Sequence, residues 1–380
     1  MKIVHLCNYI QPALGYQEYF LAREHARMNH DVTVITSDRY YPFPDYDKTV
    51  AKVLGDRMIG AKNEKIDGFK ITRLPVLIEV GTEVWLSGLK STIKRIRPDL
   101  VICHDMIYFN AIRIAKLKKK FGFRLIYDTH ASLICDSKNP IKRLFYKLQN
   151  YTPVRKNADK VIGVTEECNN YIIKKLKFPE DFPAMIPLGA DTDIFKPDEK
   201  KGKEIRKKYN INEKDFVIIY TGKMLEVKGV HLIIEAISEI KNKKNISILA
   251  VGDGNEVYIE KLEYLSSEKK VRFIKIDAVP NKELPAFYSA SDIGCWPSQA
   301  TIGTIEAIAC GLPIICVKFL KERYETGNGF GVTEGDVAEL KNYINFFLEN
   351  PEKTKEMSKL SLKAAKERFS WKAIAEEFIK

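Results

Sequence analysis

The hydrophobic residues of this chain fall into short runs that alternate with longer stretches of helical period. The runs lie at 3–6, 32–36, 100–103, 124–127 and 161–164 in the first half and at 216–220, 246–251, 271–274, 293–296 and 313–317 in the second. Between them, apolar residues recur at i, i+3, i+4 and i+7, as in 230–237 and 371–378, which places them on one face of a helix. Strands that alternate with helices are typical of doubly wound parallel sheets. The pattern therefore predicts an α/β protein.

The alternation is interrupted at 186–197, where prolines and a glycine precede a lysine-rich stretch. The 380 residues are enough for two domains, each with its own core. We therefore place a hinge in this segment. We expect ligands in a cleft that faces the carboxyl ends of both sheets, because open α/β folds bind ligands there.

The composition is that of a globular protein, with 45% hydrophobic and 29% charged residues. No apolar run approaches the roughly 20 residues of a membrane-spanning helix. Residues 1–8 reach a polar side chain too early for a signal peptide, so we expect a cytoplasmic protein. The seven cysteines contain no Cys-x-x-Cys pair, which favours buried thiols, and no His/Cys cluster has metal-ligand spacing.

The net charge of +12 favours a polyanionic partner such as nucleic acid, an anionic membrane or a phosphate-bearing substrate. No aromatic RNA-binding pattern, zinc finger or repeat accompanies the charge, so we expect no nucleic acid partner. Residues 139–148 predict a basic amphipathic helix, which either packs on the first sheet or lies on an anionic membrane. With three lysines at 118–120 nearby, we expect peripheral membrane contact.

The first candidate site is the sequence TGKMLEVKG at 221–229, between the strand 216–220 and a helix. Lys223 and Lys228 lie on a turn bounded by Gly222 and Gly229, so both can reach a diphosphate at the helix N-terminus. The spacing is neither a Walker A loop nor a GxGxxG fingerprint, which disfavours NTPase and dehydrogenase chemistry. On these residues alone, a solvated basic turn is an equal alternative.

The second candidate site is PSQATIGTIEAIACGLP at 297–313. The small residues Gly303 and Thr304 are expected to leave backbone amides free at a helix start, where anions bind. Glu306 falls in the first turn, where it can accept hydrogen bonds from ribose hydroxyls. The alternative for this glutamate is that it only compensates the helix dipole.

Both clusters resemble those of glycosyltransferase family 4, which are retaining enzymes of the GT-B fold. YIQPALGYQE at 9–18 is similar to the family's glycine loop, and IPLGAD at 186–191 is similar to its interdomain motif. VGDG at 251–254, PNKEL at 280–284 and SASD at 289–292 follow in the family's order. The resemblance runs through nearly the whole chain.

This resemblance implies two Rossmann-like domains that face a cleft. Residues 1–187 are then an acceptor-side domain, and 188–360 are a domain that binds the nucleotide sugar. C-terminal helices at 361–380 are expected to pack back toward the first domain.

The resemblance also implies roles for individual residues. Lys223 and Lys228 bind the donor diphosphate, and Glu306 binds the ribose. The remaining expected donor-binding residues are Gly15, whose loop closes over the phosphate, Gly222, Val279 beside the base, and the Gly303 and Thr304 amides.

Two histidines follow predicted strands of the first domain. His130, in a Thr-x-His motif, is expected to contact the reacting sugar, and His104 is expected to lie near the acceptor. A structural role is the alternative for His130. The family's Glu-x7-Glu pair is incomplete, because Ser298 stands eight residues before Glu306, in a shortened loop. We expect Ser298 or Thr301 to take the place of the missing glutamate.

The resemblance implies transfer of a sugar from a nucleotide-diphosphate sugar with retained configuration and without a metal or cofactor. The acceptor is expected to be a glycan or a lipid-linked molecule, in the synthesis of a surface polysaccharide or glycolipid. Two alternatives stay open, namely a nucleotide-sugar epimerase of the same fold and a catalytically silent subunit that binds nucleotide sugar.

Overall fold

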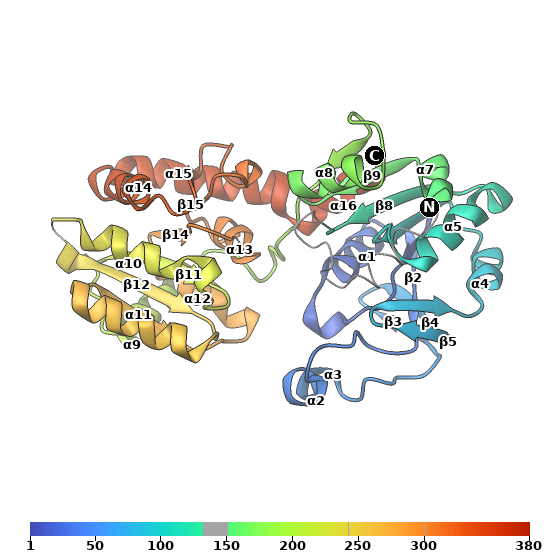
Figure 1. The fold of residues 1–380 in the computed structure, drawn as a ribbon, viewed down its shortest axis with the longest axis horizontal. Coiled ribbons are helices and arrows are strands. Elements are labelled where there is room, and N and C mark those ends of the chain that lie inside the picture. The colour runs from blue at the N-terminus through green and yellow to red at the C-terminus, as the bar shows by residue number, and fades with distance from the viewer. Residues whose placement is uncertain (132–150, 242, 300) are drawn as a thin grey trace. The chain divides into compact units, whose positions relative to one another are not determined.

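The computed structural model describes residues 1–131, 151–241, 243–299 and 301–380. The chain forms two compact units (Figure 1). The first unit comprises Met1–Pro187 together with Ile374–Lys380, and the second comprises Leu188–Ala373. Each unit has its own hydrophobic core, so each contains the apolar interior that an independent domain requires.

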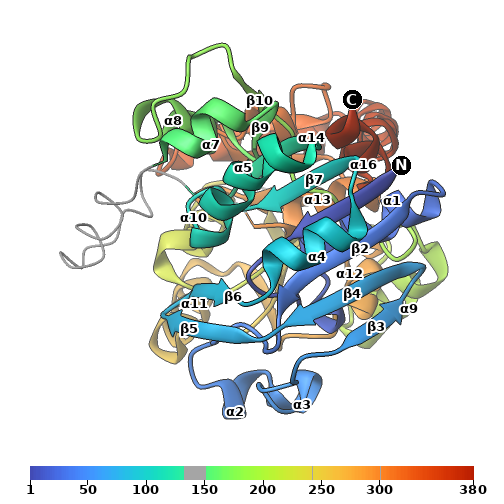
Figure 2. The ribbon, with the colours of Figure 1, turned by 90° about the vertical axis from the view of Figure 1, so that its right-hand side faces the viewer.

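The first unit contains an eight-stranded sheet, as far as the described residues go. In sheet order its strands are β10 (Pro183–Met185), β9 (Lys160–Gly163), β8 (Arg124–Thr129), β7 (Leu100–His104), β1 (Lys2–Leu6), β2 (Asp31–Ser37), β4 (Phe69–Leu74) and β3 (Asn63–Ile66). All neighbours pair in parallel except β3, which is antiparallel to β4 at the edge. A separate antiparallel pair consists of β5 (Val76–Val80) and β6 (Glu83–Leu86). Figure 2 shows β2, β4 and β3 running side by side.

The helices of the first unit connect these strands. They are η1 (Pro12–Leu14), α1 (Gln17–Arg27), α2 (Tyr46–Thr49), α3 (Ala51–Leu54), α4 (Leu89–Ile96), α5 (Phe109–Phe121), α7 (Thr152–Asn157), α8 (Glu166–Lys174) and the end of α16 (Trp371–Ile379).

The last helix, α16, joins the first unit from Ile374 onward. The Arg124 guanidinium donates to the carbonyl oxygen of Ile379 at 2.8 Å, and the Lys160 ammonium donates to that of Glu377 at 2.8 Å. Basic side chains therefore satisfy carbonyl groups at the helix C-terminus, where the backbone has no partners of its own. The expected return of the C-terminal helix to the first domain is confirmed, although the residues up to Ala373 belong to the second unit.

The second unit contains a six-stranded sheet, as described, in which all strands are parallel. In sheet order the strands are β13 (Arg272–Ile276), β12 (Ile246–Val251), β11 (Phe216–Thr221), β14 (Ile293–Trp296), β15 (Ile314–Val317) and β16 (Gly329–Val332). The helices are α9 (Glu199–Lys208), α10 (Val230–Ser238), α11 (Glu256–Lys269), α12 (Leu284–Ser289), α13 (Gly303–Ala309), α14 (Val337–Glu349) and α15 (Pro351–Ala364). Short turns are η3 (Glu226–Lys228), η4 (Lys243–Asn245), η5 (Asn281–Glu283), η6 (Lys321–Arg323) and the π-turn η7 (Ala365–Phe369).

Both sheets reverse their strand order at one point. In the second unit the chain proceeds from β11 outward to β13 and then returns to β14, so the reversal lies between β11 and β14. In the first unit the corresponding point lies between β1 and β7. Right-handed crossovers put the connecting helices on opposite faces on either side of such a point, and the loops there separate. Accordingly, α10 packs beside α11 and α14, whereas α12 packs beside α9 and α13 beside α15.

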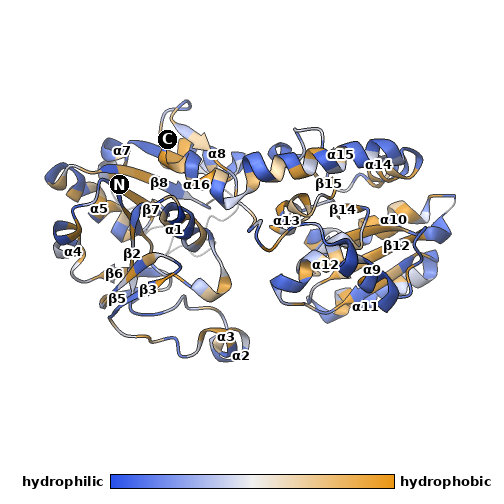
Figure 3. Ribbon diagram, turned by 180° about the vertical axis from the view of Figure 1, so that it is seen from behind, coloured by the Kyte–Doolittle hydropathy of each residue, from blue (hydrophilic) through white to orange (hydrophobic). Residues whose placement is uncertain are grey.

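The ten hydrophobic runs all form strands, so the predicted α/β architecture is confirmed. Figure 3 shows hydrophobic residues concentrated on the strands and on the helix faces turned toward them. The pattern missed β3, β4, β5, β6, β10 and β16. Strand β3 exposes alternate residues and therefore lacks a continuous apolar run.

Six cysteines are free and buried among the described residues, as expected, and Cys135 lies outside them. In the described ranges no helix has both the length and the apolar character needed to cross a membrane. The amphipathic helix predicted at 139–148 also lies outside the described residues.

Candidate functional site

A cavity of about 740 Å³ opens at the carboxyl ends of the strands of the second unit. Its lining residues lie in the loops after β11, β12, β13 and β14, within 221–225, 251–255, 278–284 and 301–306. These loops flank the point where the strand order reverses, which is the place where open parallel sheets bind ligands. We call it the second-unit cavity.

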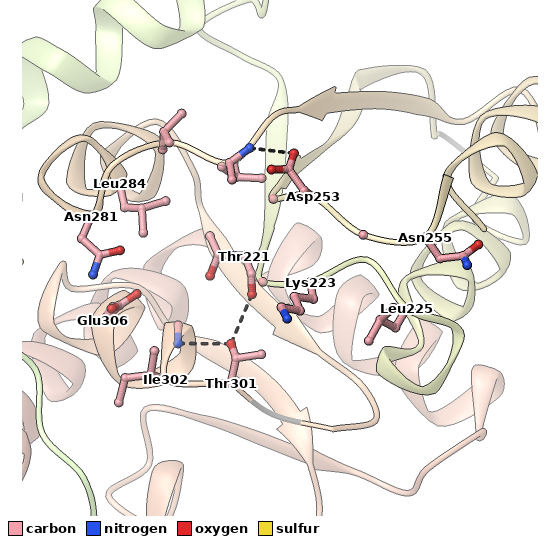
Figure 4. A pocket seen from close by; sticks show the side chains of 17 residues that line it. Thr221, Lys223, Leu225, Asp253, Asn255, Asn281, Leu284, Thr301, Ile302 and Glu306 are labelled. Atoms are coloured by element: carbon pink, nitrogen blue, oxygen red, sulfur yellow. Dashed lines mark hydrogen bonds between the residues drawn. The ribbon is translucent and has the colours of Figure 1, made fainter. Parts of the chain in front are cut away.

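The polar side chains of the second-unit cavity are spread around it. Figure 4 shows Glu306 and Asn281 on one side, Leu225 and Asn255 on the other, and Lys223 between them. Asn281 and Asn255 were not among the predicted site residues. Each follows a strand, so the expectation that ligands bind at the carboxyl ends of the strands, which pointed to Lys223, applied to them as well.

Glycines let the loops after β11 and β12 touch through their backbones. The Gly222 amide donates to the carbonyl of Val251 at 3.0 Å. A Cβ atom on Gly252, whose φ is +144°, would lie 2.1 Å from the carbonyl oxygen of Gly222, and one on Gly254 would lie 2.0 Å from that of Met224. No side chain fits at either position, so these glycines set the distance between two walls of the cavity.

The two predicted lysines have different environments. Lys223 is exposed and lines the cavity. Lys228 ends the turn η3, is partly buried, and does not line the cavity itself. Burial lowers the pKa of the Lys228 ammonium below its ordinary value, and within the described residues this ammonium has no ion-pair partner. Its position therefore suits an anionic ligand that would supply the missing partner.

Ser298 lies against the same turn. It is buried, and its Oγ atom would be 2.4 Å from a Cβ atom placed on Gly229, whose φ is +73°. Ser298 does not line the second-unit cavity, whereas Thr301 does. Of the two residues expected to replace the missing glutamate, Thr301 is therefore the one at the cavity wall.

Glu306 lies in α13 with its side chain turned into the cavity. Burial raises the pKa of this carboxyl group to about 7, although the Tyr288 hydroxyl donates to its Oε2 atom at 3.0 Å. The Tyr288 hydroxyl also lies 2.8 Å from Thr221 Oγ1, so the tyrosine links Glu306 to the end of β11. Tyr288 is fully buried on α12, and sequence reasoning missed it because its position on that helix looks like ordinary core.

The amides at the start of α13 are not free, contrary to the expectation from sequence. The Gly303 amide donates to Thr301 Oγ1 at 3.1 Å, and the Thr304 amide points to the Thr301 carbonyl at 3.3 Å. Thr301 Oγ1 in turn donates to the carbonyl of Thr221 at 3.2 Å. The threonine hydroxyl folds back on the helix start because it is the nearest available acceptor. A ligand must displace these bonds or use other donors.

The loop after β13 forms a further wall of the cavity. Val279 lies in this wall, as expected. Asp253 holds the loop through a hydrogen bond of 3.1 Å from the Ala278 amide to its Oδ1 atom (Figure 4). Asp253 was part of a quoted motif, but no role was predicted for it.

The first unit has a cavity of about 420 Å³ at the carboxyl ends of its own strands. The loops after β1, β2, β7 and β8 contribute five aromatic side chains, from Tyr9, Tyr16, Tyr41, Phe43 and Tyr108, together with Cys7, Asn8, Gln11, Glu18, His104, Asp105 and His130. We call it the first-unit cavity. It contains both predicted histidines and, among the described residues, no lysine or arginine.

Carboxyl groups surround His104 in the first-unit cavity. Its Nδ1 atom lies 2.7 Å from Oδ2 of the buried Asp128. Burial lowers the pKa of His104, but the charge and hydrogen bond of Asp128, together with the charges of Glu18 and Asp105, outweigh burial and the net pKa is raised. Burial raises the pKa of Glu18 to about 7 and that of Asp105 to about 6. None of these three carboxyl groups was predicted from sequence.

His130 lies at the end of β8 and lines the same cavity. In the described part of the chain its imidazole has no hydrogen-bond partner. Gly15 does not line the cavity. It ends the turn η1 with φ +66° and thereby connects Gln11 to Tyr16, which both line it.

Comparison with known proteins assigns the family. Residues 201–364 match the family model Glycosyl transferases group 1, and residues 19–194 match the model Glycosyltransferase Family 4. The two matches leave only the chain ends and a short linker uncovered.

Curated relatives are distant in sequence. The GDP-mannose-dependent alpha-(1-6)-phosphatidylinositol monomannoside mannosyltransferase of Mycolicibacterium smegmatis is 23% identical over 267 residues, which cover 65% of this chain and 66% of that enzyme. The chain thus matches slightly less than two thirds of that relative's length. The MMP alpha-(1->4)-mannosyltransferase of Mycolicibacterium hassiacum is 22% identical, with coverage of 94% of this chain and 91% of that enzyme.

Solved structures agree on the fold. The Anabaena protein HepE, solved in complex with UDP, has a TM-score of 0.69 and 18% identity, and the match covers 100% of this chain and 98% of that one. This similarity, together with two parallel α/β sheets, identifies the GT-B fold. With both family models matched in order along the two units, the chain belongs to glycosyltransferase family 4, within the glycosyl transferases group 1.

Proposed function

We propose that this protein is a retaining glycosyltransferase that moves a sugar from a nucleotide-diphosphate sugar to a glycan or lipid-linked acceptor. The observation that carries the proposal is the second-unit cavity. It combines a cationic side chain, a carboxyl group and backbone walls held apart by glycines, at the ligand-binding edge of a parallel sheet.

Each part of a nucleotide-diphosphate sugar has a partner in this unit. Lys223 and Lys228 supply positive charge for the diphosphate, and Glu306 supplies a carboxylate for ribose hydroxyls. Val279 lies in the wall that receives the base. Since the amides of α13 are already bonded to Thr301, the diphosphate relies on the lysines more than the sequence suggested.

The reaction consists of one exchange of bonds at the anomeric carbon. The acceptor hydroxyl oxygen bonds to this carbon while the bond from the carbon to the diphosphate oxygen breaks. Attack on the face from which the diphosphate leaves retains the configuration, and a phosphate oxygen takes the hydroxyl proton. Lys223 and Lys228 stabilise the charge that develops on the leaving diphosphate, which is electrostatic preorganisation.

The first-unit cavity supports a polyhydroxyl acceptor. Aromatic rings pack against the apolar faces of sugar rings, while carboxylate and amide groups accept and donate hydrogen bonds to hydroxyl groups. Of the relatives named above, one is a phosphatidylinositol monomannoside mannosyltransferase and the other an alpha-(1->4)-mannosyltransferase, and HepE was solved with UDP. Lipid-linked and free glycans are therefore the two acceptor classes to test.

A binding screen followed by a release assay tests the function. The thermal midpoint is measured with UDP, GDP and their sugars, and release of the diphosphate from the best nucleotide sugar is then followed with and without extracted cell lipids. We expect stabilisation by one nucleotide sugar and release that depends on acceptor. Absence of stabilisation by every nucleotide would contradict the assignment of Lys223, Lys228 and Glu306.

We also propose peripheral contact with anionic membranes, supported by the net charge of +12. Sedimentation with vesicles of anionic and of zwitterionic lipid tests it. Binding to the anionic vesicles only, lost in high salt, is expected. No binding to anionic vesicles at low salt would contradict the proposal.

A further inference from the structure

Three histidines form a continuous hydrogen-bonded chain behind the first-unit cavity. His104 Nε2, at the end of β7, lies 2.9 Å from Nδ1 of His5 on β1. His5 Nε2 lies 3.0 Å from Nδ1 of His25 on α1, and His25 Nε2 lies 2.9 Å from the carbonyl oxygen of Ala375 on α16. At its other end His104 Nδ1 contacts Asp128 Oδ2 at 2.7 Å. The chain thus connects the cavity wall to the last helix.

The carbonyl of Ala375 determines the direction of every bond in this chain. A carbonyl oxygen only accepts, so His25 must donate from Nε2. A neutral imidazole that donates from one nitrogen accepts at the other, so His25 Nδ1 accepts from His5 Nε2. By the same argument His5 Nδ1 accepts from His104 Nε2.

The carboxylate of Asp128 then determines the state of His104. Asp128 accepts hydrogen bonds from the Gln17 side-chain amide at 2.8 Å and from the Asp105 backbone amide at 3.2 Å, and both bonds favour its ionised form. An ionised Asp128 needs a donor at His104 Nδ1. With Nε2 also donating, His104 carries a proton on both nitrogens.

Burial keeps the positive charge on His104 alone. His5 and His25 are fully buried, and burial lowers the pKa of His25 to about 4 and that of His5 well below its ordinary value. Of these three histidines, only His104 contacts a carboxylate of the described residues. The titratable groups facing it come from every element packed against it, namely Glu18 of α1, His5 of β1, Asp105 after β7, Asp128 of β8 and His130 after β8.

We infer that His5 and His25 are positioning residues that hold His104 as an imidazolium with both ring nitrogens engaged, so that it provides a fixed positive charge at the cavity wall and not a proton acceptor. The protonation state of His104 follows from its hydrogen bonds alone. A role for this charge in sugar transfer rests on the proposed function, in which His104 lies near the acceptor. The charge offsets the carboxyl groups of Glu18, Asp105 and Asp128 around the acceptor. The imidazole left free for a hydrogen bond with substrate is that of His130.

Nitrogen-15 NMR of the histidine rings in the full chain tests the inference without any substrate. At pH 7 we expect His104 to be protonated on both nitrogens, and His5 and His25 to be neutral with the proton on Nε2. A neutral His104 at pH 7, or His5 with its proton on Nδ1, would overturn the inference.

Two substitutions at His25 test whether the chain acts on His104. His25→Leu leaves the His5 donor without its acceptor, and we expect the titration midpoint of His104 to fall by about one pH unit. His25→Gln can still accept from His5 and donate to Ala375, so a smaller fall is expected. An equal fall of the His104 midpoint in both variants also supports the hydrogen-bonded chain, because it would mean that only an imidazole at position 25 can accept from His5 and donate to Ala375 at once.

The matched control is His231→Leu in the second unit, where the histidine is bonded to Tyr258 at 2.8 Å and lies outside the chain. It should leave the His104 titration unchanged. An unchanged midpoint in both His25 variants would overturn the inference. If His25→Leu does not fold, the wild-type NMR spectrum and the His104 midpoint in His25→Gln still test the inference.

The transfer assay separates this inference from the proposed function. If transfer occurs, we expect the alkaline limb of its pH profile to move to lower pH in His25→Leu, together with the His104 midpoint. A wild-type protein that transfers no sugar with any acceptor counts against the proposed function, whereas the NMR result stands independently.

Discussion

At the scale of single residues, Lys228 is partly buried and has no ion-pair partner within the described residues. Lys261, by contrast, is exposed and paired with Glu226 at 2.7 Å. Desolvation of an ammonium without a counter-ion destabilises the unliganded protein. Binding of an anion offsets this cost. Such a residue is expected to matter for the ligand more than for the fold.

The first prediction follows for Lys228→Ala. We expect the transfer rate to fall about 100-fold or more, because one preorganised charge at the leaving diphosphate is lost. The thermal midpoint without ligand should not fall. The exposed, paired Lys261→Ala is the control and should keep full activity. Unchanged turnover in Lys228→Ala would contradict the assigned role.

Glu306 provides the second prediction, on stability and pH. Its pKa is about 7 in the folded protein and 4.5 ordinarily. Between these values the folded state binds more protons than the unfolded chain, so the free energy of unfolding falls as pH rises through this window. Glu306→Gln removes the burial of a charge, and we expect it to stabilise the protein at pH 8 by about 1–3 kcal/mol.

The same substitution should weaken binding of the nucleoside diphosphate about 10- to 100-fold, because a charged acceptor for the ribose is lost. Thermal unfolding at pH 8 and pH 5 measures the first effect, and the stability gain should shrink at pH 5. Titration calorimetry measures the second effect. A variant that is more stable yet binds nucleotide normally would show that Glu306 is only a structural residue.

At the scale of elements, the donor site depends on two loops whose backbones touch. Gly252→Ala is predicted to destabilise the protein by about 2 kcal/mol or more, since its Cβ would overlap the Gly222 carbonyl and its φ is +144°. We expect weaker nucleotide binding as well, because the displaced loop carries Lys223. Denaturant unfolding and calorimetry measure both effects.

The matched control is Gly335→Ala. Gly335 also has a positive φ, +80°, but open space surrounds its would-be Cβ atom. It should cost only the backbone strain of about 1 kcal/mol and leave binding unchanged. Equal losses in the two variants would mean that the contact between the loops does not matter.

At the scale of the whole molecule, we predict that donor binding slows amide hydrogen exchange in the second unit and not in the first. A bound nucleoside diphosphate should slow amide hydrogen exchange in the loops after β11, β12, β13 and β14, which line the second-unit cavity. The loops that line the first-unit cavity should exchange as before. Protection confined to the first unit would contradict the donor site.

Much of this organisation could be predicted from the sequence, because strands, helix starts and strand-end clusters depend on neighbouring residues. The ten predicted strands are rich in apolar residues, and glycines mark the turn at 221–229. Edge strands such as β3 could not be predicted, since their exposed residues lack that signal. The hydrogen bonds of the Gly303 and Thr304 amides could not be predicted either, because they depend on the conformation of Thr301.

The sequence by itself therefore determined the fold class, the family and the loops that form the second-unit cavity. Only the tertiary structure decided which distant side chains meet. His5, His25, His104 and Asp128 are spread over more than a hundred residues, and Ala375 lies at the other end of the chain. They come together because β7 pairs with both β1 and β8, and because α16 returns to the first unit. Such contacts depend on strand order and helix docking, which no local pattern of residues encodes.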